Sequence, residues 1–184
     1  MLPKATPEGV EALGPDGPPV LAIVETADGL RRAHETAAAP RVFAVALGSH
    51  DLGAELLTSP RTDGLELLYA RSKLVTESAA AGLRSPFDTV FLDFRDPTGL
   101  EQEARLAHTL GFGGKLCIHP DQLGVVNAVY GPSDAELEWA RRVLDARAAG
   151  LREGRGVVAL DGRMIDTPVV RRAEWLLAQA RLRG

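Results

Sequence analysis

The chain of 184 residues is short of cysteine, of aromatic residues and of long apolar runs. Its single cysteine, Cys117, excludes a disulfide within the chain, so we expect the reducing cytoplasm as its location. No stretch approaches the ~18 consecutive apolar residues of a membrane-spanning helix, and residues 1–4 do not resemble a secretion signal. The sequence therefore predicts a protein that does not interact with membranes.

A surplus of positive charge is missing as well. The sequence has 21 lysines and arginines against 25 aspartates and glutamates, which gives a formal net charge of −4. Proteins that bind nucleic acid carry a basic surface, so we expect no nucleic-acid partner. Hydrophobic residues make up 45% of the chain, which is enough for one substantial buried core.

What the sequence does have is an alternation of apolar runs and segments with helical periodicity. The runs that read as buried strands lie at residues 20–24, 42–47, 89–94 and from 114 to a polar His-Pro-Asp turn. Between them, apolar residues recur every three or four positions over 65–82 and 100–110. This alternation predicts an α/β fold with a parallel sheet, either doubly wound or part of a (β/α) barrel.

The last part of the sequence is organised differently. Ser133 and Glu136 have the spacing of a capping box that opens a helix, and Thr167 precedes a proline at the start of the last helix. Residues 157–160 read as a short strand or extended arm between these helices. From about residue 151 onward, the pattern indicates an appended subdomain.

Acidic residues follow two successive predicted strands. Glu25 comes directly after the first, and Asp51 follows the second. Because the carboxyl ends of parallel strands meet at one edge of a sheet, both carboxylates should face the same mouth. Their repulsion is relieved if a cation lies between them, and Mg²⁺ takes one or two carboxylates together with water and substrate oxygens. The other interpretation is that each residue only caps the helix that follows it.

Six short motifs follow one another along most of the chain. They are VETA at 24–27, GSHDL at 48–52, FRD at 94–96, GFGGK at 111–115, CIHPDQ at 117–122 and DGRMID at 161–166. In order and spacing these motifs resemble those of the citrate lyase β-subunit family. This family belongs with the HpcH/HpaI aldolases, which include lyases of coenzyme A (CoA) thioesters, and with the phosphoenolpyruvate/pyruvate-binding barrels.

The resemblance implies the C-terminal part of a TIM (β/α)8 barrel with a C-terminal lid subdomain. The partial barrel would occupy residues 1–150, and the lid and oligomerisation arm residues 151–184. Residues 1–4 match the end of the family's fourth strand, so the first strands of the barrel would be missing. In the family the lid reaches into a neighbouring subunit, which implies a homo-oligomer, a trimer or a hexamer. We expect the isolated chain to self-associate or to be a fragment of a longer protein.

The resemblance also assigns roles to residues. Glu25 and Asp51 would bind Mg²⁺, and Asp166 would act as catalytic acid/base on the lid. His119 and Pro120 would be cofactor-binding residues, which shape the pocket beside the thioester arm of the substrate. The other interpretation is that they form a purely structural turn. Where the family has an acidic residue directly before the metal-binding aspartate, this sequence has His50.

The implied function is that of a Mg²⁺-dependent carbon–carbon lyase. It would cleave a 3-hydroxyacyl thioester, such as a citryl, malyl or citramalyl thioester, into a 2-oxo acid and an acetyl-CoA-type thioester. The carrier would be coenzyme A or an acyl-carrier protein. The alternative is a non-catalytic fragment or subunit that binds a partner or a 2-oxo acid. A dinucleotide-binding domain is disfavoured, because no Gly-x-Gly-x-x-Gly follows a predicted strand.

Overall fold

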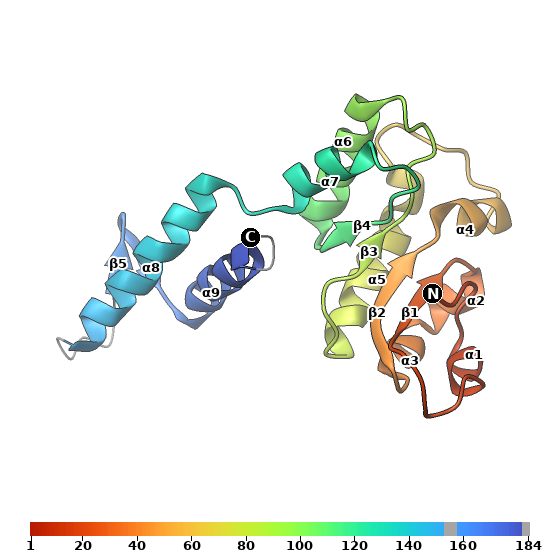
Figure 1. The fold of residues 1–184 in the computed structure, drawn as a ribbon, viewed down its shortest axis with the longest axis horizontal. Helices are drawn as coiled ribbons and strands as arrows, with labels where there is room; N and C mark the ends of the chain where they lie inside the picture. Colours follow the sequence, from red (N-terminus) through yellow and green to blue (C-terminus); the bar gives the residue numbers. More distant parts are fainter. Residues whose placement is uncertain (153–157, 182–184) are drawn as a thin grey trace. The chain divides into compact units, whose positions relative to one another are not determined.

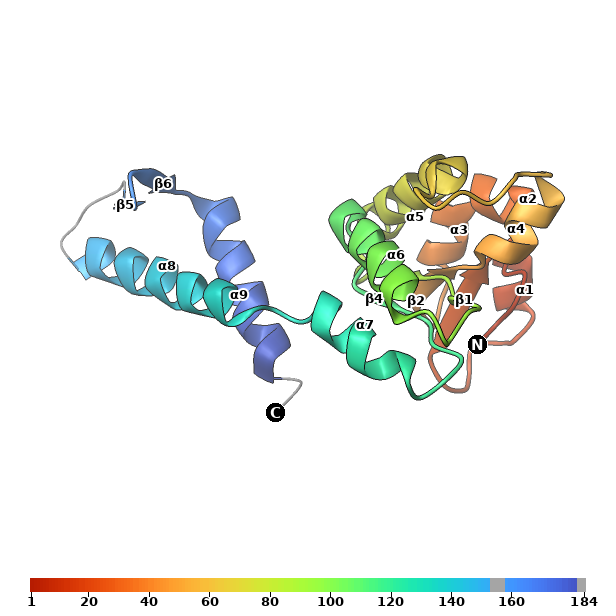
Figure 2. The same cartoon turned by 90° about the horizontal axis from the view of Figure 1, so that it is seen from above.

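The computed structural model describes residues 1–152 and 158–181, and it divides into two compact units (Figures 1 and 2). The first unit covers Met1–Tyr130 and the second Gly131–Gly184. The predicted boundary at residue 150 is therefore too late. The reason is that the helix over residues 134–152 contains the predicted boundary, packs on the last helix of the chain and belongs with it.

The first unit contains a parallel sheet of four strands in the order β1-β2-β3-β4. The strands are β1 (Val20–Val24), β2 (Val42–Leu47), β3 (Phe87–Asp88) and β4 (Gly114–Lys115). Leu2 pairs with Ala22, so the start of the chain extends the sheet beyond β1. Consecutive order without a reversal is the order of a barrel, whereas a doubly wound sheet reverses at a switch point.

The strands at 20–24 and 42–47 confirm the predictions, but the third prediction was misplaced. The strand is Phe87–Asp88, and the apolar segment from residue 89 leaves the sheet. Its backbone turns at Asp93, whose side chain accepts a hydrogen bond from the N–H of Arg95 at 3.0 Å. Hydrogen bonds within the turn thus satisfy backbone N–H groups that, in a longer strand, would bond to the neighbouring strands. The fourth strand was predicted in the right place and is likewise short.

Helices alternate with these strands as predicted. They are α1 (Pro7–Glu11), α2 (Ala27–Arg31), α3 (Ala33–Ala38), α4 (Ser49–Glu55), η1 (Leu65–Leu67), α5 (Leu68–Ala80), α6 (Pro97–Leu110) and α7 (Gln122–Tyr130). The caps of α6 show why the sequence breaks there. Asp96 accepts a hydrogen bond from the N–H of Gly99, Pro97 takes the first helical position, and Gly111 ends the helix with a φ of 108°.

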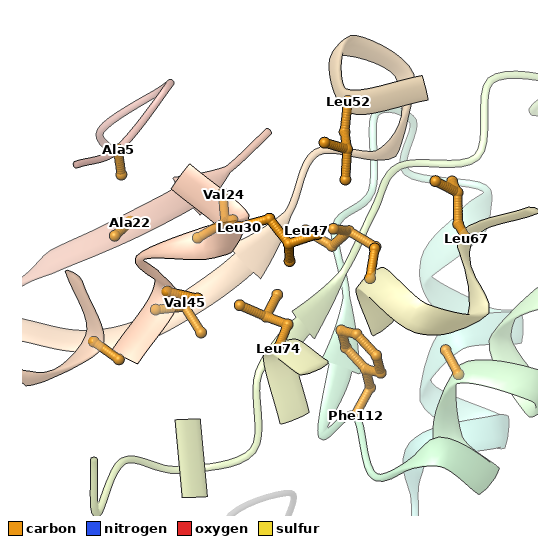
Figure 3. Close-up of a cluster of buried hydrophobic side chains, with 14 of the residues drawn as sticks. Ala5, Ala22, Val24, Leu30, Val45, Leu47, Leu52, Leu67, Leu74 and Phe112 are labelled. Atoms are coloured by element: carbon orange, nitrogen blue, oxygen red, sulfur yellow. The ribbon is translucent and has the colours of Figure 1, made fainter. Parts of the chain in front are cut away.

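Each strand sends alternate side chains to the two faces of the sheet. On the side of the helices, Val24, Val45 and Leu47 join the main core with Leu74 and Phe112 (Figure 3). The other face carries a smaller apolar layer, formed by Leu21, Ile23, Ala44, Ala46, Phe87 and Leu116. Apolar residues on both faces are typical of a parallel sheet that is covered on both sides.

A cluster of buried charges joins β3 and β4 to the helices. Asp88 is fully buried and accepts hydrogen bonds from Arg71 Nε at 3.0 Å and from Lys115 Nζ at 2.9 Å. Glu103 of α6 pairs with the same two cations. Burial would lower the pKa of Arg71, but the charge and the hydrogen bond of Asp88 outweigh burial and raise it.

The second unit consists of two helices and a hairpin. Its elements are α8 (Asp134–Arg152), β5 (Val158–Leu160), β6 (Arg163–Ile165) and α9 (Thr167–Arg181). The predicted capping box is present, because the Ser133 hydroxyl accepts from the N–H of Glu136 and the Ser133 N–H donates to the Glu136 carboxylate. The strand predicted at 157–160 is present at Val158–Leu160, and residue 157 lies outside the described residues.

The core of the second unit lies between α8, β6 and α9. It contains Ala140, Val143, Ile165, Ala173 and Leu176. Val158 of the hairpin packs so closely against Gly150 that a Cβ at Gly150 would come within 2.2 Å of it. In the part of the chain that the structure describes, no helix is both long and apolar enough to cross a membrane.

We predict that Asp88→Asn lowers the free energy of unfolding by about 3 to 5 kcal/mol, since it leaves two buried cations without their shared carboxylate. Urea denaturation would measure the change. The matched control is Glu101→Gln, which removes an exposed helical ion pair with Arg105 and should cost at most about 0.5 kcal/mol. Similar losses in both variants would show that the buried cluster contributes no more than a surface pair.

Candidate functional site

Glu25 lies at the carboxyl-terminal edge of the sheet, directly after β1. It is almost buried, with 9% of its surface exposed. Its Oε1 accepts a hydrogen bond from the N–H of Lys4 at 2.8 Å, and its Oε2 would be 2.5 Å from a Cβ placed on Gly48. Gly48 is held beside β1 by a hydrogen bond from its N–H to the carbonyl of Val24 at 2.9 Å. The missing side chain at Gly48 thus makes room for the Glu25 carboxylate.

Asp51 lies in the first turn of α4 and is exposed. Glu55 is four residues further on, so the two carboxylates share a face of the helix. Glu55 Oε2 accepts a hydrogen bond from the N–H of Ala27 at 3.2 Å, in the loop that follows Glu25. This bond directs the face with Asp51 toward the loop after β1. The structure therefore places Glu25 and Asp51 after the carboxyl ends of the parallel neighbours β1 and β2, and their joint binding of a metal ion stays a prediction.

Glu55 was not identified from the sequence as part of this site. Its spacing of four from Asp51 is the signal that could have found it, because that spacing places two side chains on one face of a helix. Gly48 was also overlooked, although a glycine between a strand and a helix is a common sign of close approach by another group. Gly48 makes space for the Glu25 carboxylate, and Glu55 orients the helix face that carries Asp51.

The chemistry of the two carboxylates fits Mg²⁺. Oxygen ligands are the ones that this ion prefers, and it needs only one or two carboxylates when water and substrate supply the rest. Within the described ranges, neither Glu25 nor Asp51 forms an ion pair. The same ranges hold no group of three or more His, Cys, Asp or Glu residues that could bind a metal ion. Two carboxylates suit a metal ion whose remaining ligands come from substrate and water. They do not suit an ion whose ligands all come from the protein.

His119 and Pro120 lie in the turn between β4 and α7. The imidazole of His119 stacks on Phe94, with ring centroids 4.7 Å apart and planes inclined by 17°. His119 Nδ1 lies 3.2 Å from the backbone nitrogen of Asp121 and 3.4 Å from its Oδ2, so Asp121 holds this edge of the ring. Pro120 is exposed. Because Phe94 belongs to the loop after β3, these contacts bring together the loops that follow two neighbouring strands.

Asp166 belongs to the second unit, where it precedes α9. Its Oδ1 accepts a hydrogen bond from the N–H of Val169 at 3.0 Å, which is the geometry of a helix N-cap. The side chain is exposed and borders a pocket of about 450 Å³ together with Arg147, Arg171 and Glu174. The structure thus gives Asp166 a capping contact, and its acid/base role stays a prediction.

A cleft of about 710 Å³ lies on another face of α4, lined by Ser49 and His50 of that helix. On the opposite wall are residues of the loop after β3, from Val90 to Asp93. The Ser49 hydroxyl donates a hydrogen bond to Thr89 Oγ1 at 2.9 Å and joins the ends of β2 and β3. His50 therefore lines the cleft, whereas Asp51 does not.

Cys117 is partly buried in the first unit, and its Sγ lies 3.8 Å from the carbonyl oxygen of Lys115. Burial raises the pKa of the Cys117 thiol, and the opposing effect of the Lys115 charge is smaller. The thiolate is the nucleophilic form of cysteine, so a raised pKa makes this side chain a poor nucleophile.

Comparison with protein families gives two matches. The HpcH/HpaI aldolase/citrate lyase family matches residues 11–120, which is more than half of the chain. The chain belongs to this family. The carbon–carbon bond lyases of the TIM-barrel fold match residues 66–184. Both matches confirm the resemblance read from the six motifs and the expected α/β fold of the barrel class.

Curated relatives of the HpcH/HpaI family align along most of the chain. The citrate lyase subunit beta of Escherichia coli (strain K12) is 41% identical over 166 residues, which are 90% of this chain and 55% of that protein. A citrate lyase subunit beta-like protein of Mycobacterium tuberculosis (strain H37Rv) is 42% identical and aligns with 98% of this chain. A (3S)-malyl-CoA thioesterase of Cereibacter sphaeroides (strain KD131) is 38% identical over 184 residues. The chain spans about half the length of the E. coli subunit.

Solved structures share the fold. The CitE protein of M. tuberculosis, in complex with magnesium, acetoacetate and coenzyme A, superposes with a TM-score of 0.81 at 42% identity over 98% of this chain and 67% of that one. RipC of Yersinia pestis gives a TM-score of 0.69 at 29% identity over 74% of this chain and 65% of that one. The chain thus shares the fold of these structures and spans about two thirds of each of them.

We predict that Gly48→Ala lowers the free energy of unfolding by about 1 to 3 kcal/mol, because the new methyl group overlaps the Glu25 side chain. The matched control is Gly124→Ala in α7, where a Cβ meets nothing within 4 Å. That control should raise stability by about 0.5 to 1 kcal/mol through helix propensity. Urea denaturation of the two variants checks the prediction, and equal stability changes would contradict the close contact.

We also predict that Cys117 reacts slowly with iodoacetamide at pH 8. Its raised pKa leaves less thiolate at that pH than a free cysteine has, so the rate should keep rising above the pH at which free cysteine levels off. Mass spectrometry of labelled protein across a pH series measures this, with free cysteine as the reference. A rate that matched or exceeded the reference at pH 8 would contradict the assignment.

Proposed function

We propose that the chain carries the metal-binding and lid segments of a Mg²⁺-dependent carbon–carbon lyase. The substrate would be a 3-hydroxyacyl thioester, such as a citryl, malyl or citramalyl thioester, and the products a 2-oxo acid and an acetyl-CoA-type thioester. The observation that carries the proposal is the placement of Glu25 and Asp51 at one sheet edge. Membership of the HpcH/HpaI aldolase/citrate lyase family supports it.

The two carboxylates differ in a way that suits a site shared with a substrate. Glu25 is held by the Lys4 N–H and by its contact with Gly48, so it offers a fixed ligand. Asp51 is exposed on α4 and can reach an ion at the open side. A bound Mg²⁺ would act as a Lewis acid on the substrate hydroxyl and on the emerging carbonyl, an effect worth roughly several kcal/mol.

Cleavage also requires a proton at the carbon that leaves as an enolate. The hydroxyl of the substrate would release its proton to water, and its oxygen would become the carbonyl oxygen of the 2-oxo acid. The adjacent carbon–carbon bond breaks, its electron pair stays on the leaving carbon as an enolate, and that carbon must then be protonated. Asp166 would deliver that proton, and it would remove it in the condensation direction. At the start of α9, Oδ1 of Asp166 is held by the Val169 N–H, which leaves Oδ2 as the oxygen that would carry the proton.

His119 and Pro120 would border the thioester arm of the substrate. The stacked and partly exposed rings of His119 and Phe94 support this, because they offer an apolar surface beside the polar Nε2 of His119. Either coenzyme A or an acyl-carrier protein can supply such an arm. The structure of CitE from M. tuberculosis contains coenzyme A, which supports the first carrier.

A homo-oligomer, a trimer or a hexamer, is part of the proposal, with the lid of one subunit closing the site of its neighbour. The second unit exposes large apolar side chains, with Met164 at 62%, Leu151 at 61% and Trp175 at 47%. These side chains are the ones that we propose a neighbouring subunit covers. For the location we propose the cytoplasm, on the ground of the single cysteine.

We predict that the chain, supplied with Mg²⁺, releases a 2-oxo acid from at least one of citryl-, malyl- and citramalyl-CoA. EDTA should abolish the release, and Asp51→Asn should reduce it by about a hundredfold or more, because a neutral amide binds Mg²⁺ poorly. Coupled detection of the 2-oxo acid measures the rate. Asp16→Asn, an exposed residue of the same type in the same unit, is the matched control and should leave the rate unchanged.

The products separate this function from its alternatives. A thioester hydrolase, as the name of the C. sphaeroides relative describes, would release free coenzyme A and the intact hydroxy acid without a 2-oxo acid. A chain that binds a 2-oxo acid but turns over none of the three thioesters would fit the non-catalytic subunit. Either result, obtained with folded protein, would contradict the lyase.

A further inference from the structure

The side chain of Gln122 is almost fully buried, with 1% of the residue exposed. Its Oε1 accepts hydrogen bonds from the N–H groups of Ile118 at 2.9 Å and of His119 at 3.3 Å. Its Nε2 donates to the carbonyl oxygen of Phe91 at 2.8 Å. The buried amide is thus paired at both ends, as buried polar groups generally are.

These bonds cross from one strand end to the next at the place where the sheet ladder stops. β3 and β4 pair through Phe87 with Gly114 and Asp88 with Lys115, and the N–H of Leu116 then donates to the carbonyl of Asp88 at 2.9 Å. In that register, Phe91 would stand opposite Ile118. The amide of Gln122 lies between these two residues and takes the place of ladder bonds where the backbones separate.

The Gln122 amide fixes the backbone of His119 on one side and that of the loop carrying Phe94 on the other. The His119 ring stacks on Phe94, and the guanidinium of Arg95 lies 5.5 Å from the centroid of the Phe94 ring. The His119 side chain is 40% exposed and Phe94 is 42% exposed, so the stack is open to a ligand. Without a tie between the two loops, the stack would depend on one ring contact alone.

We propose that Gln122 is a positioning residue, which holds His119 on Phe94 so that the stack can receive the thioester arm of the substrate. The inference rests on the proposed function, since that function supplies the ligand. Gln122 itself does not touch the ligand, because its side chain is buried and both ends of the amide are bonded within the protein.

The test replaces Gln122 by methionine, which keeps the length of the side chain and removes its hydrogen bonds. The matched control is Gln102→Met, at an exposed glutamine of α6. Two measurements are made on the full chain, with folding checked by circular dichroism. The first is the ring-current shift of the His119 Cε1–H signal in NMR. The second is the dissociation constant for coenzyme A, measured by titration calorimetry without relying on turnover.

We expect Gln122→Met to lose the ring-current shift and to weaken coenzyme A binding by about tenfold, because the stack would no longer be held in its binding position. Gln102→Met should match the unaltered chain in both measurements. A retained shift in Gln122→Met would overturn the inference, and so would a lost shift with unchanged affinity. Absence of coenzyme A binding to the unaltered chain would overturn it too. Failure of the lyase would instead be seen as absent 2-oxo acid release.

Phe94→Leu provides a second variant, which decides the matter if Gln122→Met does not fold. It removes the stacked ring and keeps the hydrogen bonds of Gln122. If the stack receives the thioester arm, Phe94→Leu should weaken coenzyme A binding to a similar extent. Unchanged affinity in this variant would contradict the proposal independently of Gln122.

Discussion

The carboxylate of Asp88 is the group on which the second half of the sheet depends. It is fully buried, and each of its oxygens accepts a hydrogen bond from a different cation, Arg71 of α5 and Lys115 of β4. A buried charge without a partner is very costly, so the three elements cannot separate without a large loss of free energy. Glu103 adds α6 to the same cluster. This matters because β3 and β4 contribute only two residues each to the ladder.

The strand ends are joined to one another by a series of single polar links. The N–H of Gly48 bonds to the carbonyl of Val24, which joins β2 to β1. The Ser49 hydroxyl bonds to Thr89, which joins β2 to the end of β3. Gln122 bonds to Phe91 and completes the series between β3 and β4. Every candidate residue of the first unit lies within a few positions of such a link, so the rim of the sheet holds these residues in fixed relative positions.

The sequence predicted those parts of the fold whose signals are local. Unbroken apolar runs identify β1 and β2, and an aspartate, a proline and a glycine at the right spacing mark the ends of α6. The third strand was misplaced because Asp88 looks like a polar break in the sequence. Its partners Arg71 and Lys115 are distant along the chain, and only the folded structure shows that the charge is neutralised.

The domain boundary and the site also separate features with local sequence signals from features that depend on contacts between distant residues. The boundary predicted after residue 150 falls inside α8, where the small size of Gly150 admits Val158. Glu25 and Asp51 could be assigned to one sheet edge from their order after parallel strands. Gln122 could not be assigned, because its partners are backbone groups whose positions follow from tertiary structure.

His50 shows what a departure from the family pattern changes here. The resemblance to the family implies that an acidic residue usually stands at this position, directly before Asp51. His50 therefore stands where a carboxylate would be. In the structure His50 lines the cleft beside α4, and its Nδ1 lies 3.5 Å from the hydroxyl of Ser49. Asp51 lies on the helix face that Glu55 directs toward the loop after β1. The exchange therefore acts on the charge of the cleft, where Glu66 and other carboxylates remain, whereas Asp51 does not line this cleft.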